Sequence, residues 1–185
     1  MWTVSRERFS MINCGLMAEK VFDLSYFNGR IAVILGSGLG QFSNYLKNQI
    51  SISYNDIPGY PSSTVAGHKG ELVCGRLDNN EIIIANGRFH YYEGYSFQQV
   101  TIPIHLFKKL GIDHLIITNS SGSMNKNFSP GSLMVVKGHM DCTYRNSPNP
   151  PVIYSDPPYH DPGLIDLAFS AAKENDIELK SGNYC

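Results

Sequence analysis

The sequence predicts an α/β domain whose mixed, largely parallel central sheet is flanked by helices. Short continuous apolar runs, such as IAVIL from Ile31, are typical of strands that are buried on both faces. They alternate with longer segments of helical periodicity, such as residues 97–111. This alternation is the pattern of strands connected through helices. At 185 residues the chain suits one domain, and we expect residues 1–185 to form it.

The first half of the chain predicts two helices and three strands. Strand 31–35 ends in GSGLG, and a helix is expected from Gln41. Segment 71–86 predicts two strands joined by a tight turn at residues 78–80. The first helix is expected over residues 6–22, with one apolar face formed by Phe9, Ile12, Leu16 and Met17.

The second half predicts two helices and three strands. Residues 97–111 predict a helix that ends at Gly111, with Pro103 early in it or bending it. The runs HLIIT and SLMVV predict strands, and IELKSGNYC begins another. The segment GLIDLAFSAAKEND predicts an amphipathic helix. Proline and asparagine gather at residues 145–163, which we expect to form a long loop.

The composition of the chain argues against a nucleic-acid-binding protein and a membrane protein. The chain is 42% hydrophobic and 17% charged with a net charge of −1, which is ordinary for a globular protein and argues against a general nucleic-acid binder. It has neither an apolar run of membrane-spanning length nor the apolar core of a signal peptide at its start, so no membrane is expected. The cysteines have no paired spacing and predict free thiols in the cytoplasm: Cys14, Cys74, Cys142 and Cys185.

Polar and small residues follow three of the expected strands, in GSGLG, NGRFHYYEG and TNSSGS. In α/β sheets, ligands bind beyond the carboxyl ends of the strands. Backbone amides of glycine-rich turns and an arginine side chain suit an anion. The sequence therefore predicts an anion pocket of phosphate size, formed by Ser37, His68, Arg88, His90 and the amides near Ser120.

Each of these motifs has a simpler interpretation when taken alone. The glycine and serine runs suit plain turns, and Arg88 suits a structural ion pair with Glu93. GSGLG has neither the dinucleotide spacing nor the lysine of a P-loop, and Ser37 lacks the flanks of a hydrolase elbow. A metal site at His139 and Asp141 is the remaining alternative, but the possible ligands are dispersed, so no metal is expected.

Several longer motifs resemble one enzyme family. VILGSGLG, GHKGELVCG, GRFHYYEGYSFQQVTIPI, LGIDHLIITNSSG and PGSLMVVKGHMD occur in the order and spacing of the trimeric purine nucleoside phosphorylases. The resemblance covers about residues 30–145 and continues weakly to the end. The related methylthioadenosine phosphorylases share the fold but usually lack the Phe-His-x-Tyr-Glu form of the motif, and they are the alternative.

The resemblance implies phosphorolysis, in which a purine nucleoside and phosphate give the free base and a (deoxy)ribose 1-phosphate. Phosphate is then the co-substrate, and no other cofactor is implied. Matching motifs give phosphate contacts at Ser37, His68, Arg88, His90 and the Ser120 amide. Tyr92 is similar to the tyrosine beside the ribose. Glu93 is similar to the residue that orients His90, which makes His90 and Glu93 the expected catalytic pair. The family resemblance also implies a homotrimer.

The sequence departs from the family in two places. Residues 120–123 read Ser-Ser-Gly-Ser where the family usually has an Ala-Ala-Gly-Gly type of turn. The chain also stops at SGNYC, where relatives enter another core strand, so we expect an N-terminal portion of a phosphorylase. The base-binding residues are then unknown, and the chain alone is expected to be impaired. A split enzyme and a phosphate-binding regulatory remnant are alternatives. The loop 146–162 is expected at a subunit contact through Tyr154 or Tyr159.

Overall fold

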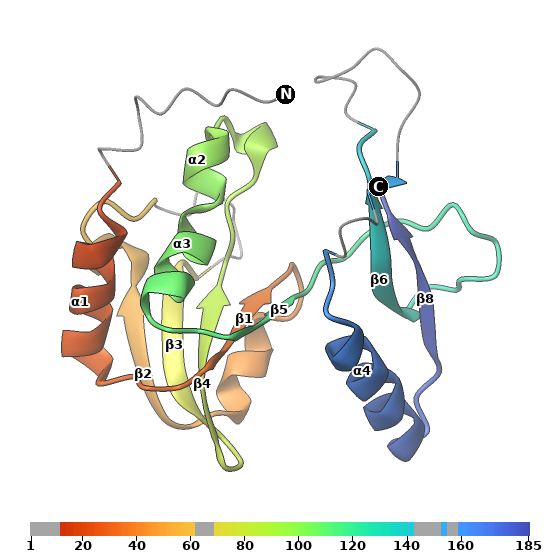
Figure 1. Cartoon of the computed structure of the whole chain (residues 1–185), viewed down its shortest axis with the longest axis horizontal. Coiled ribbons are helices and arrows are strands. Elements are labelled where there is room, and N and C mark those ends of the chain that lie inside the picture. Colours follow the sequence, from red (N-terminus) through yellow and green to blue (C-terminus); the bar gives the residue numbers. More distant parts are fainter. Residues whose placement is uncertain (1–11, 62–68, 143–152, 155–158) are drawn as a thin grey trace. The chain divides into compact units, whose positions relative to one another are not determined.

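The computed structural model describes residues 12–61, 69–142, 153–154 and 159–185. The chain divides into two compact units, residues 1–121 and 122–185. Each unit contains its own sheet (Figure 1). The expectation that residues 1–185 form a single domain stays a prediction.

The first unit is built on a five-stranded mixed sheet with the order β2-β3-β4-β1-β5. β1 runs parallel to both β4 and β5, whereas the β2–β3 and β3–β4 pairs are antiparallel. The predicted α/β class with a mixed sheet is therefore confirmed, with parallel and antiparallel pairings in equal number. The strands are β1 (Ile31–Leu35), β2 (Lys47–Ser53), β3 (Glu71–Leu77), β4 (Asn80–Asn86) and β5 (His114–Ile117).

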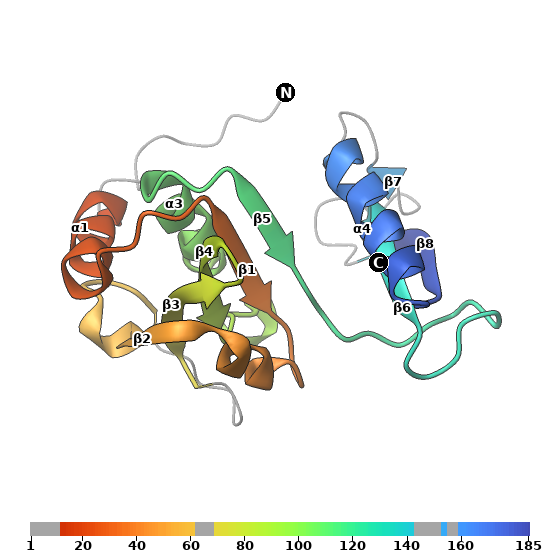
Figure 2. The same ribbon diagram turned by 90° about the horizontal axis from the view of Figure 1, so that it is seen from below.

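Helices cover both faces of this sheet (Figure 2). α1 (Cys14–Ser25) and α3 (Ile102–Lys109) pack on one face, and the short 3₁₀ helix η2 (Gly40–Tyr45) lies on the other. Side chains alternate between the two faces, so Ile34 joins the core under α1 and α3 while Val33 joins the core under η2. Burial on both faces explains why β1 and β4 are continuous apolar runs, whereas β5, at the edge of the sheet, is mostly exposed.

The first helix begins later than the sequence suggests. The side chain of Asn13 accepts a hydrogen bond from the Leu16 amide at 3.1 Å, which caps the helix so that it starts at Cys14. Met17 is buried as expected, but Leu16 is 51% exposed and does not belong to the buried face. The rest of the expected start, residues 6–11, lies outside the described residues.

Other elements differ in detail from the expected ones. The helix expected at 97–111 is two helices, α2 (Phe97–Val100) and α3, which meet at Thr101 because Pro103 sits in the first turn of α3 and lacks an amide hydrogen. The helix expected from Gln41 is the six-residue η2. β2 was not predicted, although its QISIS stretch alternates polar and apolar residues. Two further 3₁₀ helices are η3 (Tyr54–Asp56) and η4 (Tyr91–Glu93).

The second unit contains a three-stranded sheet with the order β7-β6-β8. β6 pairs in parallel with β8 and antiparallel with β7. The helix α4 (Pro162–Glu174) begins where the Asp161 side chain accepts from the Leu164 amide at 3.0 Å. The predicted helix and the strands predicted at SLMVV and IELKSGNYC are present, whereas β7 falls within the expected loop 145–163. The strands are β6 (Leu133–Met140), β7 (Ile153–Tyr154) and β8 (Leu179–Tyr184).

The prediction of four free thiols is wrong for two of them. Cys142 and Cys185 form a disulfide, whereas Cys14 and Cys74 are free. The parallel pairing of β6 with β8 places His139 opposite Tyr184, which brings the two following cysteines together across 43 residues of sequence. No local spacing in the sequence signals a pairing that a sheet creates.

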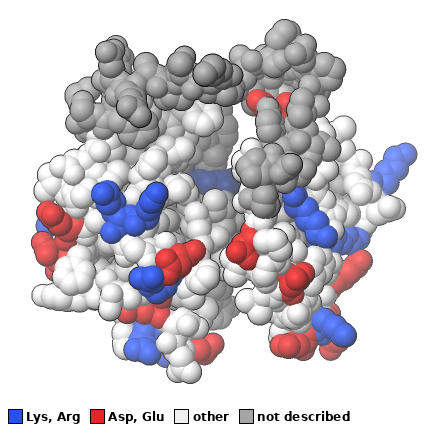
Figure 3. Space-filling model, in the orientation of Figure 1, with Lys and Arg blue, Asp and Glu red and all other residues white. Residues whose placement is uncertain are grey.

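Acidic and basic side chains are interspersed on the face of the molecule shown in Figure 3, as the near-zero net charge suggests. Within the parts of the chain that the structure describes, no helix is long and apolar enough to cross a membrane.

Candidate functional site

The three segments of polar and small residues that follow β1, β4 and β5 meet at one edge of the first sheet. β1 is the middle strand of the parallel set, with Leu35 opposite Asn86 of β4 and Ile34 opposite Ile117 of β5. Because parallel strands end at the same edge, the segments that follow β1, β4 and β5 leave the sheet side by side. This is the edge where α/β sheets bind ligands.

The turn after β1 is held tightly against the segment after β5. The Gly36 amide donates to the Thr118 hydroxyl at 2.9 Å, and the Ser120 hydroxyl donates to the Ser37 carbonyl at 3.0 Å. A Cβ atom at position 36 would lie 2.7 Å from both the Asn119 Cα and the Thr118 carbonyl oxygen. Glycine is therefore required at the start of this turn, because any side chain would push the two segments apart.

The segment after β4 forms a chain of polar contacts. Glu93 Oε1 lies 2.5 Å from His90 Nδ1 and also accepts the His90 backbone amide at 2.9 Å. Arg88 donates from Nε to His90 Nε2 at 3.0 Å and from Nη1 to the Thr118 carbonyl at 3.1 Å. The carboxylate assigns the imidazole hydrogen to Nδ1, so Nε2 is the acceptor that the Arg88 contact needs.

Aromatic packing anchors this segment to the core. Phe89, which lies between the polar residues, is buried and contacts Tyr54, Tyr60 and Tyr95. The Tyr54 hydroxyl donates to the Gly87 carbonyl at 2.6 Å. Burial, and then the nearby Glu71 carboxylate, raise the pKa of Tyr54, so it remains a neutral donor. The rigid anchor fixes the backbone from which Arg88 and the residues after it project.

Tyr92 stacks on the imidazole ring of His90. The two rings are stacked with centroids 4.7 Å apart and an angle of 17° between their planes. Tyr92 is 77% exposed, so this face of the imidazole meets a ring that is open to solvent.

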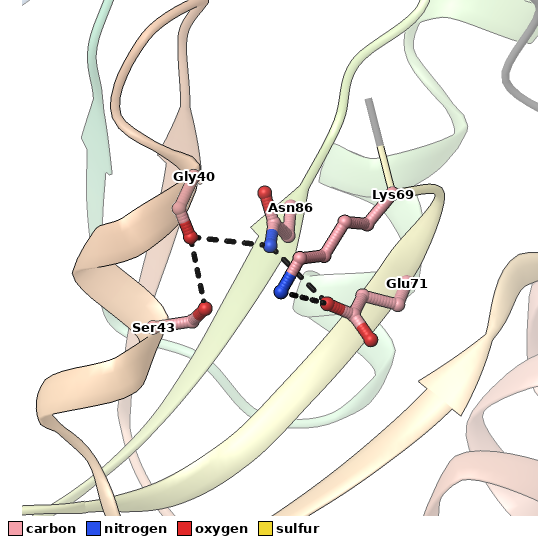
Figure 4. A network of polar contacts seen from close by, with 5 residues as sticks. All are labelled: Gly40, Ser43, Lys69, Glu71 and Asn86. Carbon is pink, nitrogen blue, oxygen red and sulfur yellow. Dashed lines mark hydrogen bonds and ion pairs between the residues drawn. The ribbon is translucent and has the colours of Figure 1, made fainter. Parts of the chain in front are cut away.

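A second polar network lies beside the turn after β1 (Figure 4). The side-chain amide of buried Asn86 donates from Nδ2 to the Gly40 carbonyl at 3.4 Å and to Glu71 Oε1 at 3.2 Å. Ser43 donates to the same Gly40 carbonyl at 3.0 Å, and Lys69 Nζ lies 3.8 Å from Glu71 Oε1. The network ties the end of the Gly36–Gly40 turn to the ends of β3 and β4.

The structure brings together six of the seven predicted site residues at this edge: Ser37, Arg88, His90, Tyr92, Glu93 and Ser120. His68 lies outside the described residues, and so does the side chain of Tyr154. Tyr159 is 55% exposed. The roles of all these residues stay predictions.

Two polar residues of the site were missed by the sequence analysis, Thr118 and Asn86. Asn86 is the last residue of β4, and Thr118 directly follows β5. Their position at the start of the polar segments was the sequence signal that could have identified them. For the metal alternative, His139 Nδ1 lies 3.3 Å from His160 Nε2. Across residues 12–61, 69–142 and 159–185, no group of three or more His, Cys, Asp or Glu side chains is placed to hold a metal ion.

Comparison with known proteins places this chain in a family. Residues 30–185 match the family described as the phosphorylase superfamily. The chain belongs to the phosphorylase superfamily. It is 48% identical over 112 residues to purine nucleoside phosphorylase 1 of Geobacillus stearothermophilus, covering 60% of this chain and 41% of the relative. It is 40% identical over 162 residues to purine nucleoside phosphorylase 1 of Bacillus subtilis, covering 84% and 60%.

Solved structures show the same similarity in three dimensions. A purine nucleoside phosphorylase in complex with ribose 1-phosphate superposes with a TM-score of 0.83 at 30% identity, covering 93% of this chain and 68% of that one. Isoform 2 of the Schistosoma mansoni enzyme, in complex with cytosine and ribose 1-phosphate, has a TM-score of 0.80 at 34% identity, covering 93% and 65%. The chain spans about 41–60% of the length of the two bacterial relatives.

Replacing Asn86 with alanine is expected to lower the free energy of unfolding by about 1–3 kcal/mol, because the Glu71 carboxylate and the Gly40 carbonyl lose a buried donor. Denaturant unfolding measures this as a lower midpoint at an unchanged slope. The matched control is Asn44→Ala at an exposed position of η2, which is expected to change stability by less than ~0.5 kcal/mol. Equal effects of the two substitutions would contradict the role given to the network.

Proposed function

We propose that this protein is a purine nucleoside phosphorylase, which uses phosphate to cleave the N-glycosidic bond of purine (deoxy)ribonucleosides. The observation that carries the proposal is the position of Arg88. Its guanidinium is fixed by His90 and the Thr118 carbonyl at the edge where three strand ends meet. A fixed cation beside glycine-rich and serine-rich turns is the arrangement that phosphate binding needs.

The reaction explains why the anion must be held so firmly. The bond between ribose C1′ and the purine nitrogen breaks through a cation-like ribosyl transition state, as in glycoside hydrolysis. A phosphate oxygen then forms the new bond to C1′, the departing base takes a proton, and the products are the free purine and a ribose 1-phosphate. Prior orientation of phosphate below the developing cation supplies both proximity and electrostatic stabilisation.

In the proposed site each residue has one task. Arg88, His90, Ser37 and the Ser120 amide bind phosphate, and His68 completes the cradle. Glu93 keeps the His90 hydrogen on Nδ1, so Nε2 accepts from Arg88 Nε and orients the guanidinium. The stacked and exposed Tyr92 packs beside the ribose. No residue of this chain is assigned to the base.

The comparisons support the proposal. The relatives reported above are named purine nucleoside phosphorylases, which favours this activity over that of a methylthioadenosine phosphorylase. Both structures reported above were solved with ribose 1-phosphate, a product of the proposed reaction. We also propose that the two units belong to one phosphorylase domain, since the family match over residues 30–185 crosses the division between them.

The proposal extends to the setting of the enzyme. We propose a homotrimer that uses no cofactor other than its phosphate co-substrate and acts in purine salvage in the cytoplasm. The location was predicted from four free thiols, and the Cys142–Cys185 disulfide leaves only Cys14 and Cys74 to support it.

The test of the proposed reaction is its dependence on phosphate. Inosine is incubated with the chain, with and without phosphate, and hypoxanthine and ribose 1-phosphate are quantified. We expect hypoxanthine release only with phosphate, accompanied by an equal amount of ribose 1-phosphate. Release at the same rate without phosphate would identify a hydrolase instead.

Arg88→Ala is expected to raise the dissociation constant for inorganic phosphate by about 10–100-fold, because it removes a charged donor from the cradle. Isothermal calorimetry on the 185-residue chain measures it. Arg88→Lys keeps the charge but not the planar fork and should fall between wild type and Arg88→Ala.

The control for Arg88 is Arg30→Ala, which changes the charge equally. Arg30 pairs with Asp113 next to the amino end of β1, at the opposite edge of the sheet, and both side chains are more than half exposed. Its removal should leave phosphate affinity unchanged. An Arg88→Ala variant with the affinity of Arg30→Ala would rule out the assigned phosphate site.

A further inference from the structure

We infer that Thr118 is the positioning residue of the phosphate cradle, an inference that rests on the proposed function. Thr118 directly follows β5 and contacts two of the other segments that form the site. Its hydroxyl contacts the end of β1 and the turn that follows, and its carbonyl holds Arg88. Its own segment continues into Ser120, which bonds to Ser37.

The Thr118 hydroxyl is fixed in both of its hydrogen-bonding roles. It donates to the Ile34 carbonyl at 3.2 Å and accepts the Gly36 amide at 2.9 Å. The Thr118 backbone amide also donates to the Ile34 carbonyl, at 3.0 Å. A hydroxyl with one donated and one accepted bond cannot rotate without losing one of them. The amide that opens the anion-binding turn is therefore held by a single side chain.

The same residue sets the position of the guanidinium. Arg88 Nη1 donates to the Thr118 carbonyl at 3.1 Å, while its Nε donates to His90. Among the residues that the structure describes, Nη2 of Arg88 has no hydrogen-bond partner, and we assign it to the anion. Because the Thr118 backbone is bonded to β1 and pressed against Gly36, a shift there moves both the turn and the cation.

If Thr118 has a positioning role, the affinity for phosphate should depend on its hydroxyl and not on the shape of its side chain. Thr118→Val keeps the shape, removes the hydroxyl and leaves the Gly36 amide without its acceptor. We expect it to raise the dissociation constant for inorganic phosphate about tenfold. Thr118→Ser restores the hydroxyl and is expected to stay within about threefold of wild type.

The matched control is Thr101→Val. Thr101 is also a half-buried threonine whose hydroxyl is bonded, but only to the carbonyls of Phe97 and Gln98 in α2. It lies outside the cradle, so phosphate affinity should not change. Hydrogen exchange gives a second readout, since the Gly36 amide should exchange faster in Thr118→Val and at the wild-type rate in Thr118→Ser and Thr101→Val.

Calorimetry of phosphate binding to the full chain separates the possible outcomes. If wild type binds phosphate and Arg88→Ala does not, while Thr118→Val binds like wild type, the inference about Thr118 is overturned and the proposed function stands. If Arg88→Ala binds like wild type, the proposed phosphate site itself fails. Thr118→Ala, which cannot overpack, is the second variant without a hydroxyl and should match Thr118→Val if the latter folds poorly. A Thr118→Ser variant as weak as Thr118→Val would also overturn the inference.

Discussion

The parallel pairing of β1 with both β4 and β5 is the constraint on which the candidate site depends. It aligns three strand ends at one edge, so that segments separated by more than 80 residues come within hydrogen-bond distance, as in the Ser120–Ser37 contact. The close approach at Gly36 then leaves room for backbone only. Each contribution to the cradle, an amide, a hydroxyl or a guanidinium, is held by a segment that the sheet has already placed.

The site is stiffened by the aromatic core around Phe89 and by hydrogen bonds between its segments. Phe89 is buried among aromatic rings while its neighbours Arg88 and His90 are half-buried, so one side chain anchors the polar pair. On the other side of the turn, Asn86 connects Gly40 with Glu71. Such preorganisation matters because electrostatic stabilisation is most effective when the donors do not have to move during the reaction.

Much of the first unit could be predicted from the sequence, and the reasons for the failures are physical. Continuous apolar runs identified β1, β4 and β5, and the motifs after them identified Ser37, Arg88 and His90 as neighbours. Local periodicity could not find Thr118, because its importance lies in a bond to Gly36 that exists only once β1 and β5 pair. The Cys142–Cys185 disulfide was missed for the same reason, since the β6–β8 pairing creates it. The predicted helix ends were wrong where a cap or a proline, rather than the apolar pattern, decides the boundary, as at Asn13 and Pro103.

The most direct test of the account is a titration of the isotope-labelled chain with inorganic phosphate, followed through its backbone amide resonances. If the three strand ends form one anion site, the amides of residues 36–40, 88–93 and 118–121 will shift together and fit a single dissociation constant. Amides at the opposite edge of the sheet, such as those of Arg30 and Asp113, will not respond. Shifts confined to one segment, or different dissociation constants for the three, would contradict a single shared site.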